Sequence, residues 1–399
     1  MMPRHPAFGY HQASRNRRRQ VYYDIWLITV VLFLIGLGLI LVSSSSISVA
    51  EKAYGEQLRF FWRQLVAVGI GLVCAFMTIS IPLVIWQRLY MYLLFLGILL
   101  LVLVLVPGIG REVNGSMRWV ELGSFSLQSS ELVRIIMIIY LAGYLLRHGE
   151  KLKQSLTGFI VPVSVVTVLA ALLLLEPDFG TAVVFFAAAL GMLFVGGVPI
   201  SRFVAWVMVA CMALGTLALG SAYRLQRLVS FMDPWSDPDN SGFQLIQALV
   251  AFGRGDWLGV GLGSSIQKLF YLPEAHTDFI FAVLAEELGL IGSVSVILLF
   301  FFVVWRSFVI AEVAEELDKK FAAYLAYGIG LMIGIQAFIN MGVNMGLLPT
   351  KGLTLPFVSY GGNSMISNCI LIGLLLRVEY ENHFTGKARL PEVANTYAA

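Results

Sequence analysis

The sequence predicts an all-α integral membrane protein with ten transmembrane helices, both termini inside the cell, and a large outer loop between helices seven and eight. Of its 399 residues, 58% are hydrophobic and 13% are charged, whereas a soluble domain carries roughly a quarter charged residues. The apolar residues also gather in runs close to the roughly 20 that a helix needs to cross a bilayer. This composition excludes a cytosolic enzyme, a disordered chain and a small secreted scaffold. It also disfavours an outer-membrane barrel, whose strands alternate in polarity.

Each apolar run is expected to form one helix. The runs lie at 24–46, 61–81, 89–106, 132–147, 157–175, 180–197, 203–220, 279–305, 321–345 and 364–377. Lys and Arg favour the cytoplasmic side of short loops, and both the N-terminal tail, 1–22, and the short loop 147–153 are basic. We therefore expect a membrane domain, 23–380, with cytoplasmic tails at both ends, the second of which is 381–399.

Two outer segments, 107–130 and 221–277, are longer than ordinary connections between helices. Connections of more than about 15 residues are usually functional or disordered. The second segment is rich in Trp, Phe and Tyr and contains Gly259–Gly263, which is not the composition of a disordered linker. We expect it to fold back onto the helices, partly as short helices in the membrane interface.

The mouth of the eighth helix carries four acidic residues and a histidine. An ionised side chain in hydrocarbon costs about 2.5–3.5 kcal/mol on insertion scales, so these residues should face a cavity, a partner or water. Asp278 is a candidate for chemistry, and its alternative role is to cap the helix N-terminus. Glu274 and His276 are candidates for substrate binding, although His276 could be an ordinary interface histidine. Glu286 and Glu287 are expected to serve packing or a partner contact.

Two further polar groups lie around the first outer segment. Glu131 and Arg134 are three residues apart and can pair on one helix face, either for structure alone or as the wall of an outward cavity. Arg118 beside Trp119 could bind an anion or anchor the chain at the membrane interface.

The segment 348–364 interrupts a membrane-depth stretch with two prolines, several glycines and several hydroxyls. Non-helical backbone at that depth is tolerated only where protein or a water-filled cavity satisfies it, so we expect a re-entrant loop that lines a site. Ser359 is a candidate polar contact in it. Lys351 suits a phosphate as a compact point charge, and its alternative role is to extend towards the surface.

Two smaller features favour structural roles. Asp178, in the acidic turn between helices five and six, is expected to cap helix six. Asn340 and Asn344, four residues apart, are typical of hydrogen bonding between membrane helices.

Several common motifs are absent from the sequence. It has no GxxxxGK[ST] phosphate loop, no HExxH motif and no Cys/His cluster. The polar residues gather on the outer side, whereas many secondary transporters place theirs near the midplane. This distribution favours chemistry at the outer surface.

Four sets of residues resemble the SEDS family, whose main members are FtsW and RodA. They are Asn114–Trp119 with Gln128–Leu132, Glu176–Gly180, Pro273–Glu287 and Leu348–Ser364. The resemblance runs in order from about Tyr23 to Tyr380, and two strings, Tyr271–Phe279 and Asn344–Thr354, are more similar to the FtsW branch than to the RodA branch.

The resemblance implies a peptidoglycan glycosyltransferase that polymerises lipid II at the outer face of the bacterial inner membrane, at the division septum. It implies a class B penicillin-binding protein (a transpeptidase) and divisome regulatory membrane proteins as partners. The family's proposed catalytic Asp falls on Asp278, and residues implicated in activity or substrate handling fall on Trp119, Glu131 and Lys351. We expect no nucleic acid among the partners and no organic cofactor.

The implied chemistry suits these residues. Asp278 would act as the general base on the acceptor 4-hydroxyl, and polyprenyl pyrophosphate would depart. Arg118, Arg134 or Lys351, or a divalent cation such as Mg or Mn, would neutralise the pyrophosphate. Two other functions stay open at this point: a lipid II flippase, and a non-catalytic divisome scaffold.

Overall fold

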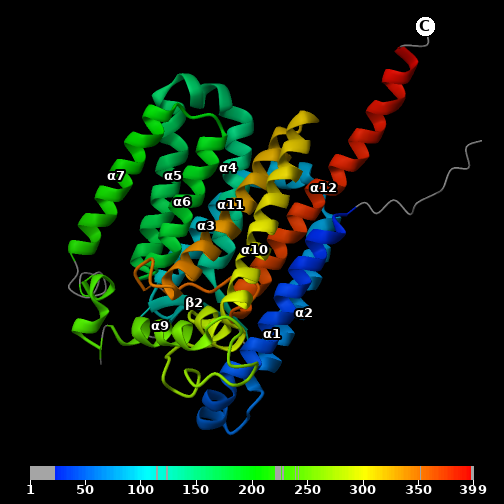
Figure 1. The fold of residues 1–399 in the computed structure, drawn as a ribbon. Coiled ribbons are helices and arrows are strands. Elements are labelled where there is room, and N and C mark those ends of the chain that lie inside the picture. Colours follow the sequence, from blue (N-terminus) through cyan, green and yellow to red (C-terminus); the bar gives the residue numbers. More distant parts are fainter. Residues whose placement is uncertain are drawn as a thin grey trace, which may run out of the picture.

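A computed structural model describes residues 23–113, 116–122, 125–220, 226, 229–238, 240, 242–350 and 352–396. They form a helical bundle with a long C-terminal helix that projects beyond it (Figure 1). The helices are α1 (Ile25–Tyr54), α2 (Arg59–Ser80), α3 (Leu83–Leu105), α4 (Ser129–Gln154), α5 (Leu156–Leu175), α6 (Phe179–Val195), α7 (Ile200–Leu219), α9 (Phe243–Gly255), α10 (Ile280–Glu316), α11 (Lys320–Asn344) and α12 (Gly362–Thr396), with a 3-10 turn at Pro234–Ser236.

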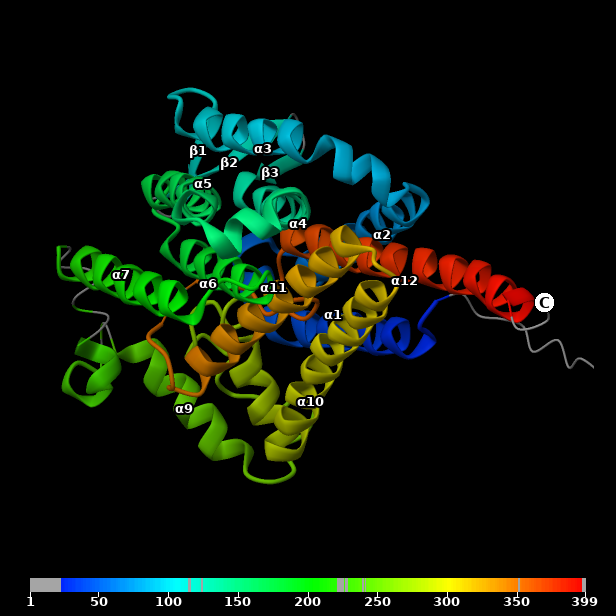
Figure 2. The ribbon, with the colours of Figure 1, turned by 90° about the horizontal axis from the view of Figure 1, so that it is seen from above.

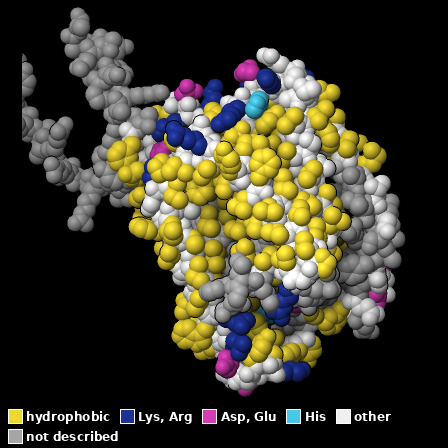
Figure 3. Space-filling view, turned by 180° about the vertical axis from the view of Figure 1, so that it is seen from behind, with side chains coloured by type: hydrophobic (Ala, Val, Ile, Leu, Met, Phe, Trp, Pro, Cys, Tyr) yellow, Lys and Arg dark blue, Asp and Glu magenta, His cyan; other side chains and the backbone are white. Residues whose placement is uncertain are grey.

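The protein is a multi-pass membrane protein. In the described part of the chain, seven helices are long and apolar enough to cross a bilayer, namely α1 to α5, α10 and α11. The helix α6 and the stretch Ile200–Ala210 of α7 are shorter but also apolar. Each of the ten predicted runs overlaps one helix and extends beyond it by at most two residues. Figure 3 shows the resulting surface: hydrophobic side chains form a broad band, and charged side chains gather towards its two ends.

The helices α4 and α11 form the centre of the bundle. In their most apolar stretches 83% and 61% of the residues are buried, against 22% in α2 and 28% in α3. Viewed from above, α7 lies at the periphery and α12 leaves the bundle beside α2 and α10 (Figure 2). The helix α11 packs against α10, α6 and α4, and α12 packs along α2. The polar residues in the middle of these helices, such as Arg134, Gln336 and Ser367, therefore face protein and not lipid.

The all-α prediction is wrong between α3 and α4. There the chain forms a three-stranded antiparallel sheet of β1 (Gly110–Val113), β2 (Ser116–Leu122) and β3 (Phe125–Gln128). The strands pair Arg111 with Trp119, and Trp119 with Gln128. The sequence does carry a signal: polar and apolar residues alternate from Ser116 to Trp119, and the dipeptide Asn114-Gly115 is typical of a hairpin. The long apolar runs on either side give a stronger signal, for helix.

The long outer segment folds back onto the bundle as predicted. Its helix α9 packs against α10 and α11. Beyond α9 the backbone comes into contact with α10 at Gly259, where φ is 78° and a Cβ atom would lie 2.2 Å from the carbonyl oxygen of Glu287. The helix α10 itself is interrupted at Gly289, whose φ is 67°. The first turns of α10, 280–288, therefore form a short helical stretch that the outer segment covers.

The C-terminal tail, 381–399, begins inside a helix. The helix α12 continues from the membrane domain to Thr396, well past the predicted end at 377. The sequence has no proline between 377 and Pro391 to end the helix, and helix termini are among the features that a sequence predicts least well.

Candidate active site

A non-helical segment, described over 345–350 and 352–361, connects α11 to α12 through the interior of the bundle. Leu355, Phe357 and Val358 are almost completely buried. A Cβ atom on Gly38, near the middle of α1, would lie 2.7 Å from both the Phe357 carbonyl oxygen and the Val358 Cα. Because the segment touches the middle of a 30-residue apolar helix, it lies at membrane depth. This confirms the prediction of a buried, non-helical loop, which we call the re-entrant segment.

Side chains from other helices satisfy the backbone of the re-entrant segment. Gln64 of α2 donates to the Ser359 carbonyl (3.1 Å), and its own amide oxygen accepts from the Gly361 N–H (3.2 Å). The Ser359 hydroxyl accepts from the Leu355 N–H (2.7 Å). Gln336 of α11 donates to the Thr354 carbonyl (3.0 Å). Ser359 thus contributes to the fold of the segment itself, and Gln64 and Gln336 are two supporting residues that sequence reasoning missed.

Asp278 lies directly before α10 and beside the re-entrant segment. A Cβ atom on Gly352 would lie 3.1 Å from the Asp278 Oδ2 atom, so the glycine leaves room for this carboxylate. The N-cap of α10 is Phe279, with no side-chain cap hydrogen bond. Asp278 is therefore not the cap residue of α10, contrary to the alternative that the sequence left open. Lys351 lies outside the described residues.

His276 and Glu274 belong to the turns that precede Asp278. The His276 ring packs between Phe60 and Tyr360, with ring centroids 4.9 and 5.6 Å away. Its carbonyl accepts from the Tyr360 N–H (2.9 Å), which joins this turn to the re-entrant segment. Burial lowers the pKa of His276, so the ring is neutral at pH 7, although Glu274 acts in the opposite direction. Glu274 is exposed, and its carboxylate accepts from the Thr277 hydroxyl (2.7 Å).

Arg118, on β2, lies over the acidic turn between α5 and α6. Its guanidinium donates to the carbonyls of Glu176 (3.4 Å) and Pro177 (2.5 Å) and lies 3.8 Å from the Asp178 carboxylate. Asp178 caps α6 by accepting from the Thr181 N–H (3.2 Å), as predicted. Trp119 follows Arg118 on β2 and is half-buried. Arg118 therefore contacts protein carbonyls, yet keeps 25% of its side chain exposed.

Glu176, in the same turn, is a buried carboxyl that forms no ion pair with the other residues that the structure describes. Its Oε2 atom accepts from the Ser129 hydroxyl (3.2 Å), and its Oε1 atom has no hydrogen-bond partner. Burial raises its pKa to about 8, with Asp178 adding to the shift and Arg118 opposing it. The turn also approaches the re-entrant segment, because a Cβ atom on Gly180 would lie 3.0 Å from the Leu353 side chain.

Glu131 and Arg134 form the predicted pair on α4, at 2.6 Å. Arg134 is 3% exposed. Its guanidinium also donates to the Ser367 hydroxyl and the Ser364 carbonyl of α12, and to the Gln336 amide oxygen. The donors of Arg134 are thus taken up by protein groups, and the residue supports the re-entrant segment through Gln336.

Glu286 and Glu287 form a clamp with the outer segment. Glu286 accepts from Arg254 (2.8 Å), from the Ser265 hydroxyl and from the backbone N–H groups of residues 266 and 267. Glu287 pairs with Lys268 (2.8 Å) and accepts from the Ser44 hydroxyl of α1 (3.0 Å). Both carboxylates are buried, which confirms the expected packing role.

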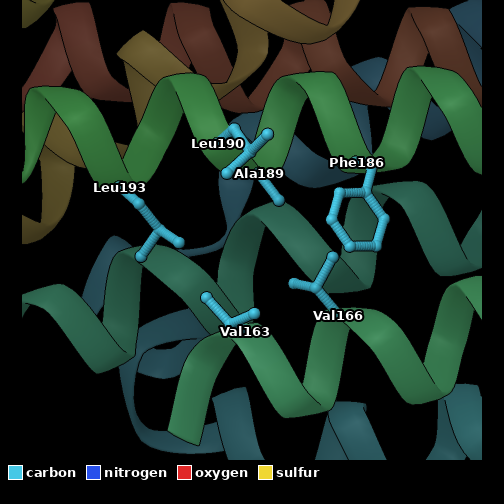
Figure 4. A pocket seen from close by; sticks show the side chains of 6 residues that line it. All are labelled: Val163, Val166, Phe186, Ala189, Leu190 and Leu193. Carbon is cyan, nitrogen blue, oxygen red and sulfur yellow. The ribbon is translucent and has the colours of Figure 1, made fainter. Parts of the chain in front are cut away.

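The described residues contain no group of three or more His, Cys, Asp or Glu side chains that could hold a metal ion. A small recess does lie between α5 and α6, lined by Val163, Val166, Phe186, Ala189, Leu190 and Leu193 (Figure 4). Every lining side chain is apolar, so this recess does not suit a sugar or a phosphate. The polar site is instead the region where Asp278 meets the re-entrant segment. Five of the predicted site residues belong to that segment, contact it, or contact side chains that pack beside it: Asp278, His276, Ser359, Glu131 and Arg134.

A protein-family model that matches most of the chain shows the family to which it belongs. Residues 25–384 match the FtsW/RodA/SpoVE family model, described as "Cell cycle protein". The chain belongs to this family. Two relatives named probable peptidoglycan glycosyltransferase FtsW, from Nitrosococcus halophilus and Halorhodospira halophila, are each 53% identical to it. The alignments cover 92% and 96% of this chain, and 94% and 98% of the relatives.

Solved structures of the family share the fold. A chain from a structure described as "Structural coordination of polymerization and crosslinking by a peptidoglycan synthase complex" gives a TM-score of 0.74 at 29% identity, covering 90% of this chain and 98% of that chain. The rod shape determining protein RodA of Thermus thermophilus gives 0.67 at 26% identity, covering 91% and 99%. The overall fold of this chain is therefore that of the family.

Proposed function

We propose that the protein is a peptidoglycan glycosyltransferase that polymerises lipid II at the outer face of the bacterial inner membrane during septal wall synthesis. One observation carries the proposal: the Asp278 carboxylate lies against a non-helical segment at membrane depth, where Gly352 leaves space for it. A lipid-linked sugar could reach such a place while its polyprenyl tail stays in the bilayer. The relatives named probable peptidoglycan glycosyltransferase FtsW support the same reaction.

In the proposed reaction the acceptor 4-hydroxyl oxygen attacks the anomeric carbon of the donor sugar. The bond from that carbon to the pyrophosphate oxygen breaks, and polyprenyl pyrophosphate departs with the electron pair. The hydroxyl proton passes to the Asp278 carboxylate, which acts as general base. A direct displacement of this kind inverts the anomeric configuration. No acid is needed at the leaving oxygen, in contrast to the glycosidases, because pyrophosphate is already a good leaving group.

Other residues have supporting roles in this proposal. Arg118, partly exposed above the acidic turn, and Lys351 are the cations proposed for the departing pyrophosphate. Trp119, Glu274 and His276 are proposed to contact the sugar or its peptide near the mouth of the site. Glu131, Arg134 and Ser359 would act indirectly, since they support the re-entrant segment. A divalent cation such as Mg or Mn stays a further candidate for neutralising the pyrophosphate.

The topology and the partners also belong to the proposal. We place ten spans in the membrane domain, 23–380, with the tails 1–22 and 381–399 in the cytoplasm, because the basic tail and the basic loop 147–153 favour that side. A class B penicillin-binding protein is proposed as the transpeptidase partner, with divisome regulatory membrane proteins acting on the pair. The related peptidoglycan synthase complex, described as coordinating polymerisation and crosslinking, supports such a pairing.

A polymerisation assay tests the proposal. Purified protein would receive lipid II and a divalent cation, with and without a class B penicillin-binding protein, beside the Asp278→Ala variant. We expect glycan strands from the wild type and none from the variant. If the wild type makes no strands even with its partner, the proposal fails, and a lipid II translocation assay in vesicles would then separate a flippase from a scaffold.

A further inference from the structure

Three amide side chains of α11, Gln336, Asn340 and Asn344, are spaced four residues apart and therefore share one face of the helix. All three are buried. Their amide groups bind the backbone on both sides of the candidate site: the residue before α10 on one side and the re-entrant segment on the other. We call these three residues the amide ladder.

The central residue of the ladder joins the two sides directly. The Asn340 Nδ2 atom donates to the Asp278 carbonyl (2.9 Å) and also to the Leu353 carbonyl (2.5 Å). An amide NH₂ group has two hydrogens, so both donors are used, one on each chain segment. Leu353 follows Gly352, whose backbone lies against the Asp278 carboxylate. One side chain thus sets the separation between Asp278 and the segment opposite it.

The other two residues fix each side separately. Asn344 Nδ2 gives the Asp278 carbonyl a second hydrogen bond (2.9 Å), and its Oδ1 atom accepts from the Ala282 N–H (3.0 Å) in the first turn of α10. It thereby supplies the cap that Phe279 cannot provide. Gln336 donates to the Thr354 carbonyl (3.0 Å) and accepts from Arg134.

We propose that the amide ladder is a positioning device: it holds the Asp278 backbone and the re-entrant segment in register, and the rate of glycosyl transfer depends on that register. The inference rests on the proposed function, in which Asp278 is the general base. A carbonyl bound by two amides cannot rotate freely, so the backbone from which the Asp278 side chain extends is held in place. Misplacement of a reacting group by about 1 Å can lower a rate by about 100-fold.

The chain offers a matched control for the ladder. Asn382 is also buried, and its Nδ2 atom donates to the carbonyl of Ile310 (3.1 Å), which lies at the opposite end of α10. Its Oδ1 atom has no hydrogen-bond partner among the described residues, and the same is true of Asn340. Asn382→Asp therefore makes the same chemical change as Asn340→Asp, also at a buried amide that donates to a backbone carbonyl, but far along the chain from Asp278.

The experiment measures kcat and KM for lipid II polymerisation in the complex with the partner, together with the melting temperature. Asn340→Asp is expected to lower kcat by about 10- to 100-fold and to leave KM within about twofold, because the ladder binds backbone and not substrate. Asn382→Asp is expected to lower the melting temperature while kcat stays within about twofold of the wild type. Equal kcat values for the two variants, at a temperature where both are folded, would overturn the proposal.

Hydrogen exchange gives a readout that does not depend on activity. In Asn340→Asp, peptides covering 277–283 and 352–358 should both exchange faster than in the wild type, and neither should change in Asn382→Asp. Faster exchange in only one of them would refute the joining role of Asn340. If Asp278→Asn proves active, the proposed function fails, but these exchange rates still decide whether the ladder joins the two segments.

Asn344→Asp provides a second variant should Asn340→Asp fail to fold. It keeps the oxygen that accepts from the Ala282 N–H and loses only the donation to Asp278 and to the Asn340 carbonyl. Its kcat is expected to fall by about 10-fold, with faster exchange at 277–283. A kcat within about twofold of the wild type would contradict the proposal.

Discussion

The acidic residues around the start of α10 fall into two groups that differ in burial and in the contacts described for them. Glu286 and Glu287 are buried, and Arg254 and Lys268 match their charges at 2.8 Å each. Asp278 lies only two turns earlier, is partly buried, and is held through its backbone by neutral amides of α11. The comparison indicates that Glu286 and Glu287 hold the outer segment in place, whereas the position of Asp278 suits the role of general base proposed above.

The clamp gives the largest expected effect on stability. Lys268→Met would leave the Glu287 carboxylate buried without its cation, and breaking a buried pair in this way costs about 3–5 kcal/mol. We expect a clear fall in melting temperature, while folded protein keeps a specific activity within about twofold of the wild type. The control is Lys52→Met, because Lys52 is exposed and lies over the Phe270 ring of the same outer segment. Equal melting temperatures for both variants would show that the Glu287–Lys268 pair does not stabilise the fold, and would contradict the role given to Glu286 and Glu287.

Glu176 is buried like Glu286 and Glu287. Unlike them, it forms no ion pair with any other residue that the structure describes. Burial raises its pKa from the ordinary 4.5 to about 8. A raised pKa in the folded state means that its contribution to stability is complete below pH 4.5 and is lost as the pH rises towards 8. Glu176→Gln should remove this loss, so the variant should melt higher than the wild type at pH 8.5.

The measurement for Glu176 is the melting temperature from pH 5 to pH 9. The wild type should lose more stability over this range than Glu176→Gln. Glu51→Gln, which replaces an exposed carboxyl, serves as the control and should follow the wild type. Parallel curves for wild type and Glu176→Gln would contradict the assignment of a neutral, buried carboxyl.

A substitution at Gly352, beside the Asp278 carboxylate, is expected to give the smallest of these effects. A methyl group at Gly352 would lie 3.1 Å from the Asp278 Oδ2 atom, so Gly352→Ala must shift the carboxylate by a few tenths of an ångström. We expect kcat to fall by about 10-fold, which corresponds to about 1.4 kcal/mol. Gly361→Ala is the matched control in the same segment, because its methyl group would find ordinary contacts at 3.4 Å or more. Identical kcat values for the two variants would show that the carboxylate does not need this space.

The sequence alone predicts the helices and the re-entrant segment because both depend on local polarity and length. It also predicts the Glu131–Arg134 pair and the Asp178 cap, since each joins residues within three positions. It does not predict that Gln336 and Gln64 hold the re-entrant segment, because those contacts join residues far apart in the chain. It separates Asp278 from Glu286 and Glu287, but it does not predict that Arg254 and Lys268 pair with the latter two, because only the folded chain brings those partners close.

The most direct test of the central claim compares Asp278→Asn with Glu287→Gln in the partner-bound protein. The measured quantities are the polymerisation rate of lipid II and the melting temperature. We predict that Asp278→Asn loses at least about 100-fold in rate, the usual scale for a general base, with a melting temperature close to that of the wild type. Glu287→Gln should show the reverse. A folded, partner-bound Asp278→Asn protein that polymerises at the wild-type rate would contradict the account.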